Sequence, residues 1–268
     1  MNTSSNPFTL RTALLTLALL TGCGTSLSSS VEQISGRSVE LVEVGAGQAT
    51  VVFESGLGND WSAWDPVASE VATAARVFAY SRPGYGRSDP STDPRDAAHI
   101  MEDLRSLLAA RGYAPPYVLV GHSFGGTYME LFAKRHPEEV AALVLVEPRH
   151  RDFTQACAAA GLTGCEIPAP VVATLPAVQI AEYMGFAKTS EEIAASAFGH
   201  HPVRVLTATA HGFAPEAEAL WQSMLGALAD EAADGEQILF PGANHNLEID
   251  RAHEVAEVIK GVLPQSMR

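Results

Sequence analysis

The chain is poor in cysteine and in basic residues. Its 268 residues include three cysteines, and 17 lysines and arginines stand against 31 aspartates and glutamates, for a formal net charge of −14. Three cysteines are too few for a fold built on disulfides, and no paired-cysteine or His-Glu-x-x-His spacing predicts a metal site. Without a cluster of lysine and arginine, such an acidic chain is repelled by phosphate backbones, which argues against nucleic acid as a partner.

Long apolar runs are also missing. No run reaches the roughly 20 residues that a membrane-spanning helix requires. What the sequence does have, 47% apolar and 18% charged residues, is typical of a globular protein. A chain of this length can bury a large core, and we expect one domain with an insertion.

The first 22 residues have the pattern of an export signal peptide. A single charge, Arg11, precedes a short apolar run, and residues 20–23 read Leu-Thr-Gly-Cys. Small residues directly before a cysteine resemble the lipobox of bacterial lipoproteins, which implies cleavage before Cys23 and a lipid anchor on that cysteine. Because Gly24 stands where many inner-membrane lipoproteins have aspartate, the resemblance implies the bacterial cell envelope, on the outer membrane or the periplasmic side. An ordinary secretory signal, with a secreted product, is the alternative.

A tether is expected over residues 23–36, because the Ser-rich stretch 25–30 shows no hydrophobic periodicity. Export places the chain in an oxidising compartment, where Cys157 and Cys165 remain after lipidation of Cys23. We expect a local disulfide between these two, with two free thiols as the alternative.

From residue 37 onward, short apolar runs alternate with longer amphipathic stretches. Strands are predicted at 50–54, 77–80, 117–120, 143–146, 203–206 and 237–240, and helices at 61–75, 97–111, 124–136, 215–230 and 251–262. This alternation implies an α/β fold, with a mostly parallel sheet and helices on both faces. Residues 148–200 break the rhythm, so we expect a cap insertion there within a single domain over 37–268.

The strongest chemical signal is residues 121–125, which read Gly-His-Ser-Phe-Gly, between a predicted strand and a predicted helix. Glycines on either side let the backbone turn sharply and expose Ser123 above the sheet, whereas an ordinary glycine-rich turn is the plain alternative. A serine nucleophile needs a histidine to take its proton, and that histidine needs a carboxylate to orient it.

Nine histidines compete for the role of base. His245 follows the last predicted strand, and parallel sheets gather their sites at the carboxyl ends of strands, so His245 is our candidate. His136, at a helix end, and His122, inside the turn, are expected to be structural. The reserve candidates are His200, His201 and His211.

The order of elements, the serine turn and the late histidine resemble the α/β-hydrolase superfamily over about residues 37–263. Residues 54–58 resemble the oxyanion-loop region of that superfamily, and residues 81–89 resemble its Asp-Arg-Pro-Gly turn. Each segment departs from the pattern at one position, because Ser55 replaces a frequent histidine and Ser81 a frequent aspartate.

By this resemblance the backbone N–H groups of Leu57 and Phe124 would form an oxyanion hole. In much of the superfamily the triad acid follows the strand at 203–206, but no carboxylate occurs there before Glu216. Some branches, including certain haloalkane dehalogenases, place the acid after the preceding strand, which here ends at Glu147.

We therefore expect a triad of Ser123, Glu147 and His245. The alternative is that Glu147 only pairs with Arg149 or caps the next turn. The resemblance implies a serine hydrolase that cleaves a small carboxylic ester through an acyl-enzyme and uses no cofactor. A serine in place of an aspartate nucleophile argues against dehalogenase and epoxide hydrolase chemistry.

Three other functions stay open for the same residues: an amidase or peptidase, a carbon–carbon bond hydrolase, and a non-catalytic protein that binds small molecules. Substrate identity is expected to depend on the cap insertion.

Overall fold

The computed structural model describes Met1 and residues 26–265. The expected signal peptide and Cys23 therefore lie outside the described residues. The described part forms one eight-stranded sheet in the order β1-β2-β4-β3-β5-β6-β7-β8. Its strands are β1 (Ser30–Ile34), β2 (Arg37–Val44), β3 (Thr50–Glu54), β4 (Arg76–Tyr80), β5 (Tyr117–His122), β6 (Val140–Val146), β7 (Val203–Ala208) and β8 (Gly235–Phe240).

The sheet is parallel from β4 to β8 and antiparallel where β2 joins β1 and β4. All six predicted strands are present, with ends shifted by a few residues, so the predicted α/β fold with a mostly parallel sheet is confirmed. The helices of the described chain are η1 (Trp61–Trp64), α1 (Asp65–Val71), α2 (Ala97–Ala110), α3 (Phe124–Arg135), η2 (Pro137–Glu139), α4 (Phe153–Ala159), α5 (Ala169–Val172), α6 (Ala177–Ala194), α7 (Pro215–Asp230), α8 (Leu247–Asp250) and α9 (Ala252–Gly261).

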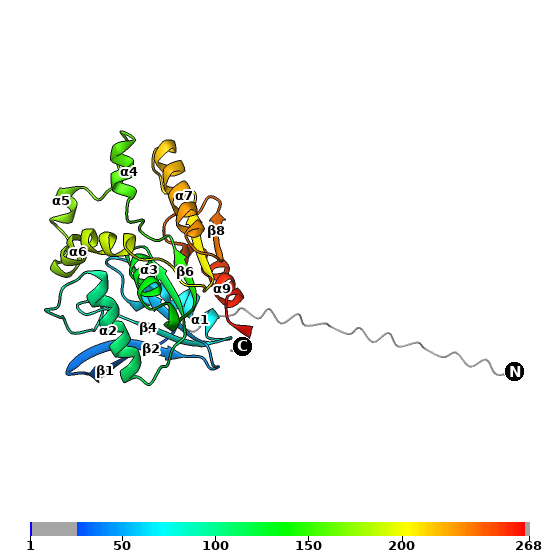
Figure 1. Cartoon of the computed structure of the whole chain (residues 1–268). Helices are drawn as coiled ribbons and strands as arrows, with labels where there is room; N and C mark the ends of the chain where they lie inside the picture. The colour runs from blue at the N-terminus through cyan, green and yellow to red at the C-terminus, as the bar shows by residue number, and fades with distance from the viewer. Residues whose placement is uncertain (2–25, 266–268) are drawn as a thin grey trace.

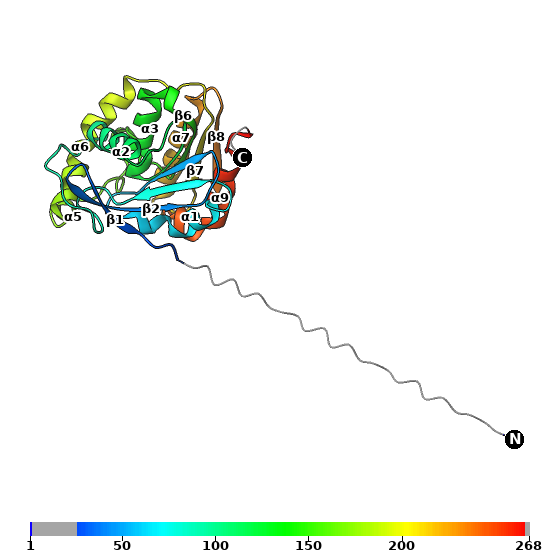
Figure 2. The same ribbon diagram turned by 90° about the horizontal axis from the view of Figure 1, so that it is seen from below.

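Two apolar cores lie on opposite faces of the sheet, because successive side chains of a strand point to opposite sides. In β5, Val118 and Val120 pack with α1 and α9, whereas Leu119 packs with α2, α3 and α7. Seen from below, the sheet separates α1 and α9 from α2, α3 and α6 (Figure 2). The central strands are buried on both faces, which explains why their sequences are continuous apolar runs.

The expectation of a tether over residues 23–36 is wrong at its C-terminal end. Residues Ser30–Ile34 form the edge strand β1, which pairs with β2 across a two-residue turn at Ser35 and Gly36. Both turn residues have positive φ, 52° and 83°, as tight hairpin turns require. β1 was missed because an edge strand needs no apolar run, and all five of its residues are exposed or half-buried.

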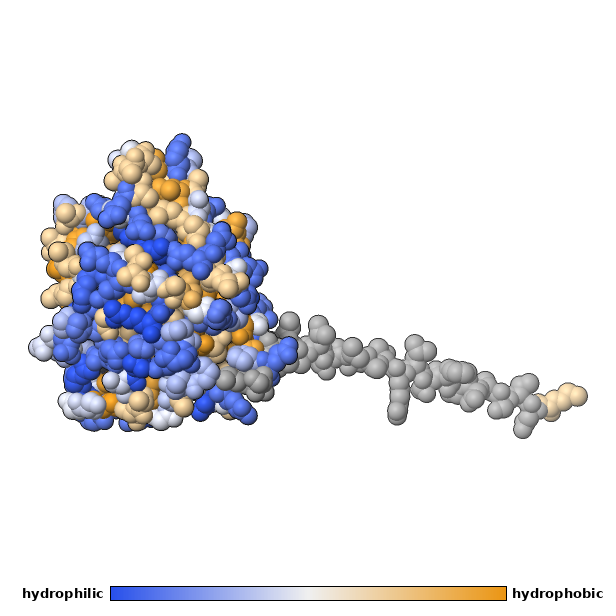
Figure 3. All heavy atoms as spheres, in the orientation of Figure 1, coloured by the Kyte–Doolittle hydropathy of each residue, from blue (hydrophilic) through white to orange (hydrophobic). Residues whose placement is uncertain are grey.

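Helices α4, α5 and α6 lie between β6 and β7, within the residues 148–200 that we call the cap (Figure 1). Cys157 of α4 and Cys165 of the following loop form a disulfide, with their Cα atoms 6.3 Å apart. Apolar surface gathers over the cap helices in the view of Figure 3, and Val171 and Met184 are among the exposed large apolar side chains. Among the described residues, none of the helices has the length and apolar character needed to cross a bilayer.

Candidate active site

Ser123 occupies a strained turn between β5 and α3. Its backbone has φ 52° and ψ −118°, outside the regions that side chains ordinarily allow, at a cost of about 1–3 kcal/mol. Two backbone hydrogen bonds hold the turn: Ser123 N–H donates to the carbonyl of Val146 at 3.1 Å, and Arg149 N–H donates to the carbonyl of Ser123 at 3.0 Å. The serine is therefore fixed to the end of the neighbouring strand β6.

The glycines beside Ser123 are required by close backbone approach. A Cβ atom on Gly121 would collide with the carbonyl of Gly125, and one on Gly125 would collide with the carbonyls of Glu54 and Ser55. The first contact closes the turn on itself, and the second packs it against the end of β3. The turn thus reaches this position only with glycine at both sites.

Glu147 directly follows β6, is fully buried and also has a positive φ of 48°. Its Oε1 accepts the N–H of Ala208 at 2.6 Å. Its Oε2 lies 3.1 Å from His245 Nδ1 and 2.5 Å from His211 Nε2. Burial opposes ionisation of this carboxyl, but the hydrogen bonds with His211 and His245 outweigh burial and hold the pKa of Glu147 below its usual value.

His245 lies in the loop between β8 and α8, and 40% of its side chain is exposed. Glu147 holds its Nδ1, and no other group of the described residues hydrogen-bonds its Nε2. Because His245 and Ser123 line the same cavity, Nε2 is the nitrogen that remains to take a proton.

His211, a reserve candidate, also belongs to this site. It lies in the loop after β7, where its Nε2 contacts Glu147 and its Nδ1 lies 2.8 Å from Glu218 Oε1. Burial opposes its protonation, but these two carboxylates raise the pKa of His211 above its usual value. With both ring nitrogens engaged, His211 has no free lone pair for a serine proton.

The other candidates lie outside the site. Glu216 is exposed on α7, so the acid that the superfamily usually places after β7 is absent here. His201 packs edge-on against Phe198, and neither it nor His200 lines the cavity. His136 lies near Glu102 instead.

His122 lies beneath His245 and is structural, as expected. Its Nε2–H donates to the carbonyl of His245 at 3.0 Å, and its Nδ1 lies 3.2 Å from Glu248 Oε1. Burial lowers the pKa of His122 to about 3 and raises that of Glu248 to about 8. At neutral pH the buried Glu248 carboxyl therefore holds its proton, and the His122 ring is uncharged.

The cavity at these residues has a volume of about 480 Å³. Its lining combines the strand-end loops with the cap: Leu57, Ser123, Phe124, Arg149, Phe153, Gly164, Cys165, Glu166, Ile167, Pro168, His211, Phe213, Trp221 and His245. Leu57 and Phe124, the expected oxyanion residues, are both in this lining. Within the described chain, the backbone N–H groups of Leu57 and Phe124 have no acceptor.

The comparisons with known proteins agree with this architecture. The family described as "alpha/beta hydrolase fold" matches residues 49–160. A solved α/β hydrolase fold protein from Burkholderia ambifaria superposes with a TM-score of 0.64 at 21% identity, covering 88% of this chain and 98% of that one. This is an α/β-hydrolase-fold protein.

Two curated relatives of this hydrolase-fold chain are bacterial. The uncharacterized protein YqjL of Bacillus subtilis is 27% identical over 215 residues, which are 79% of this chain and 82% of the relative. A second relative bears the name "Putative carbamate hydrolase RutD" in Caulobacter vibrioides and is 35% identical over 102 residues, 38% of each chain. These matches show the fold, and the chemistry must be argued from the site itself.

One buried cluster of this hydrolase fold was missed in the sequence. Arg82 lies in the turn-like segment 81–89, and its guanidinium donates to the carbonyls of Ser55 and Gly56 and so holds the loop that carries Leu57. It also pairs with Glu54 at 2.6 Å and with Glu182 of α6 at 2.9 Å. The proline and glycine residues around Arg82 pointed to a turn, but no sequence signal linked it to an acid 100 residues later.

Ligand atoms of Glu147, His211 and His245 lie within 4.8 Å of one another, a set that two histidines and a carboxylate could offer to a metal ion. The hydrogen bonds among the three account for that spacing without an ion.

Proposed function

We propose that the protein is a serine hydrolase that cleaves a small carboxylic ester. The observation that carries the proposal is the orientation of His245: Glu147 engages Nδ1 at 3.1 Å, and Nε2 is left free in the cavity that Ser123 also lines. A histidine held in this way has the tautomer that accepts a serine proton.

The reaction follows the acyl-enzyme sequence. Ser123 Oγ attacks the ester carbonyl while His245 Nε2 takes the hydroxyl proton, and the imidazolium that forms is stabilised by Glu147. His245 then gives that proton to the departing alcohol, which leaves Ser123 acylated. A water molecule gives a proton to His245 and attacks the acyl group, and return of the proton to Ser123 Oγ releases the acid.

Negative charge develops on the carbonyl oxygen in each tetrahedral intermediate. The free backbone N–H groups of Leu57 and Phe124 are the donors proposed to receive it, and removal of one such donor typically lowers kcat about 10²- to 10³-fold. Arg82 is proposed to support this role by holding the carbonyls of Ser55 and Gly56, the second of which shares a peptide unit with the Leu57 N–H.

The test is labelling of Ser123 with a fluorophosphonate probe, together with turnover of 4-nitrophenyl esters of increasing chain length and of the matching anilides. We expect stoichiometric labelling that Ser123→Ala abolishes and His245→Ala weakens. Faster turnover of anilides than of esters would favour an amidase or peptidase. A wild-type protein that neither labels nor turns over any substrate would contradict the proposal and favour a binding protein.

We further propose that the protein is exported and lipid-anchored through Cys23. The support is sequence alone, the Leu-Thr-Gly-Cys segment after a short apolar run. In cells, the full-length protein should partition into a detergent phase and the Cys23→Ala variant should not. Equal partitioning of the two would contradict the anchor.

A further inference from the structure

Arg149 is a cation with no carboxylate in direct contact among the described residues; the more distant Glu166 acts on it only through space. Of the arginines that the structure describes, all but Arg149 and Arg76 have a carboxylate oxygen within 4.0 Å. Arg149 Nη2 donates to the hydroxyl of Thr154 at 2.7 Å, and the guanidinium lies 5.6 Å from the centre of the Phe186 ring. Its Nε is buried and has no acceptor.

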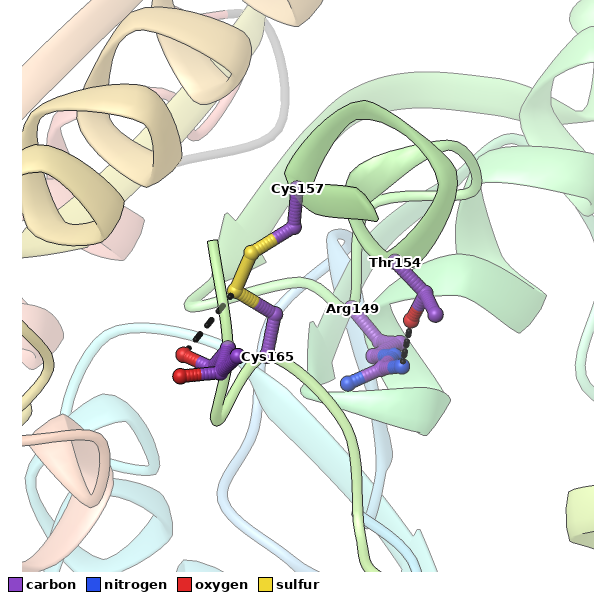
Figure 4. The surroundings of a disulfide bond; sticks show 5 residues. Arg149, Thr154, Cys157 and Cys165 are labelled. Atoms are coloured by element: carbon purple, nitrogen blue, oxygen red, sulfur yellow. Dashed lines mark hydrogen bonds between the residues drawn. A yellow bond between two sulfur atoms is a disulfide. The ribbon is translucent and has the colours of Figure 1, made fainter. Parts of the chain in front are cut away.

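Backbone hydrogen bonds to the turn at Ser123 fix the position of Arg149. Its backbone N–H donates to the carbonyl of Ser123 and its own carbonyl accepts the hydroxyl of Thr127 at 2.7 Å, so the residue is fixed beside the turn. The side chain lines the active-site cavity and an adjoining cavity of about 540 Å³ under α6. Figure 4 shows it next to Thr154 of α4 and the disulfide that closes this side of the cap.

The electrostatics of Arg149 differ from those of the paired arginines. Burial lowers the pKa of Arg149, whereas carboxylate neighbours outweigh burial and raise the pKa of Arg82 and Arg151. Glu166 lines the same cavity but is exposed, and its carboxylate is more than 4.0 Å from the guanidinium. Burying a charged group without a hydrogen-bonded counter-ion costs free energy. An anion that reaches the Arg149 guanidinium would offset this cost through strong, directional hydrogen bonds.

We propose that Arg149 binds a carboxylate carried by the substrate, so that the preferred ester is an anion. This inference rests on the proposed ester hydrolysis at Ser123. The planar guanidinium matches a carboxylate with two parallel hydrogen bonds, and Nε, which lacks an acceptor, is one of the donors available. The acidic surface does not prevent this contact, because charges more than about 8 Å apart are screened at physiological ionic strength.

The test compares charged and neutral esters of matched chain length. Mono-4-nitrophenyl adipate and 4-nitrophenyl hexanoate place the carboxylate on the acyl side, and 4-carboxyphenyl and 4-carbamoylphenyl butyrate place it on the alcohol side. For at least one pair, Arg149→Gln should lower the ratio of charged to neutral kcat/KM by about 10- to 100-fold, the range expected for a charge-assisted hydrogen bond. Arg149→Lys should restore part of the ratio. Arg76→Gln, the matched control, should leave the ratio unchanged.

Binding provides a readout that does not need turnover. Calorimetry with monomethyl adipate and the Ser123→Ala protein should show binding that the added Arg149→Gln change weakens by a similar factor. If neither ester is hydrolysed but this binding is seen, the proposed function fails and the anion site stands. An equal loss for both members of each pair, or binding insensitive to Arg149→Gln, would overturn the anion site while leaving ester hydrolysis intact.

Discussion

The floor and the roof of the cavity are held in place by different forces. On the floor, Ser123 and Glu147 follow adjacent buried strands, and each has a positive φ that the surrounding backbone bonds enforce. The roof is the cap, whose long helix α6 is fixed by the buried carboxylate of Glu182 among arginines. The comparison indicates that the sheet positions Ser123 and Glu147, whereas buried charge and a disulfide position the cap residues around the cavity.

The largest effect is expected on the floor, from Glu147→Gln. The neutral amide cannot stabilise the imidazolium of His245, so kcat/KM should fall about 10³- to 10⁴-fold with little change in fold. Steady-state kinetics on a 4-nitrophenyl ester measures this loss. Glu218→Gln is the control, because Glu218 contacts His211 and not His245. Full activity in Glu147→Gln, with loss of activity in Glu216→Gln, would move the acid to α7.

On the roof, Glu182→Gln should affect stability more than chemistry. The change leaves Arg82 with only Glu54 and Arg95 with no carboxylate among its described partners, and breaking such a buried pair typically costs about 3–5 kcal/mol of unfolding free energy. Chemical denaturation measures it. Glu192→Gln, on the same helix but partly exposed, should cost less than about 1 kcal/mol. Similar losses in both variants would mean that burial of Glu182 does not anchor the cap.

The same contrast explains what the sequence could and could not predict. Continuous apolar runs mark the central strands because both of their faces are buried, and the glycines around Ser123 mark a turn that few other residues allow. Helix α6 gives no such signal, since its buried side chains include Glu182 and Thr189 as well as Ile193. Pairing of Glu182 with an arginine far away in sequence is a property of the folded chain alone.

In the candidate site, too, some residues could be predicted from the sequence and others could not. Ser123 and His245 stand in loops that the strand pattern locates, and the structure brings both to one cavity. For His211, the sequence could predict a position beside a strand but not a role. That role depends on sharing Glu147 with His245, which only the folded chain shows. Strand β1 was missed for a simpler reason, the polar character of an edge strand.

Beneath the floor, Glu248→Gln should stabilise the protein in a pH-dependent way. Burial raises the pKa of Glu248 from 4.5 to about 8, so the folded state holds a proton that the unfolded state releases between these values. The free energy of unfolding of the wild type therefore falls as pH rises through this range, by up to about 1.4 kcal/mol per pH unit. At pH 7 the free energy of unfolding of Glu248→Gln should exceed that of the wild type by about 3 kcal/mol.

Urea denaturation at pH 5, 7 and 8.5 measures this lead. Near pH 5 the residue at position 248 is largely uncharged in both folded proteins, so the two should have similar stability there. The control Glu254→Gln, at an exposed position on α9, should show a flat difference across the range. A Glu248→Gln lead that does not grow with pH would mean that the carboxyl is already ionised at pH 5.

The smallest effect is expected from His211→Gln, which tests whether the second histidine only positions Glu147. The amide can donate one hydrogen bond to Glu147 but carries no charge, so kcat/KM should fall only about threefold to tenfold, against the far larger loss in His245→Gln. Because the pKa of His211 is raised, its contribution to stability is complete below about pH 6.5 and is lost as pH rises through the folded-state pKa. The stability lead of wild type over His211→Gln should therefore shrink from pH 6 to pH 9 in urea denaturation. A loss of activity as large as that of His245→Gln would instead make His211 the proton acceptor, and its two carboxylate contacts would have to break during turnover.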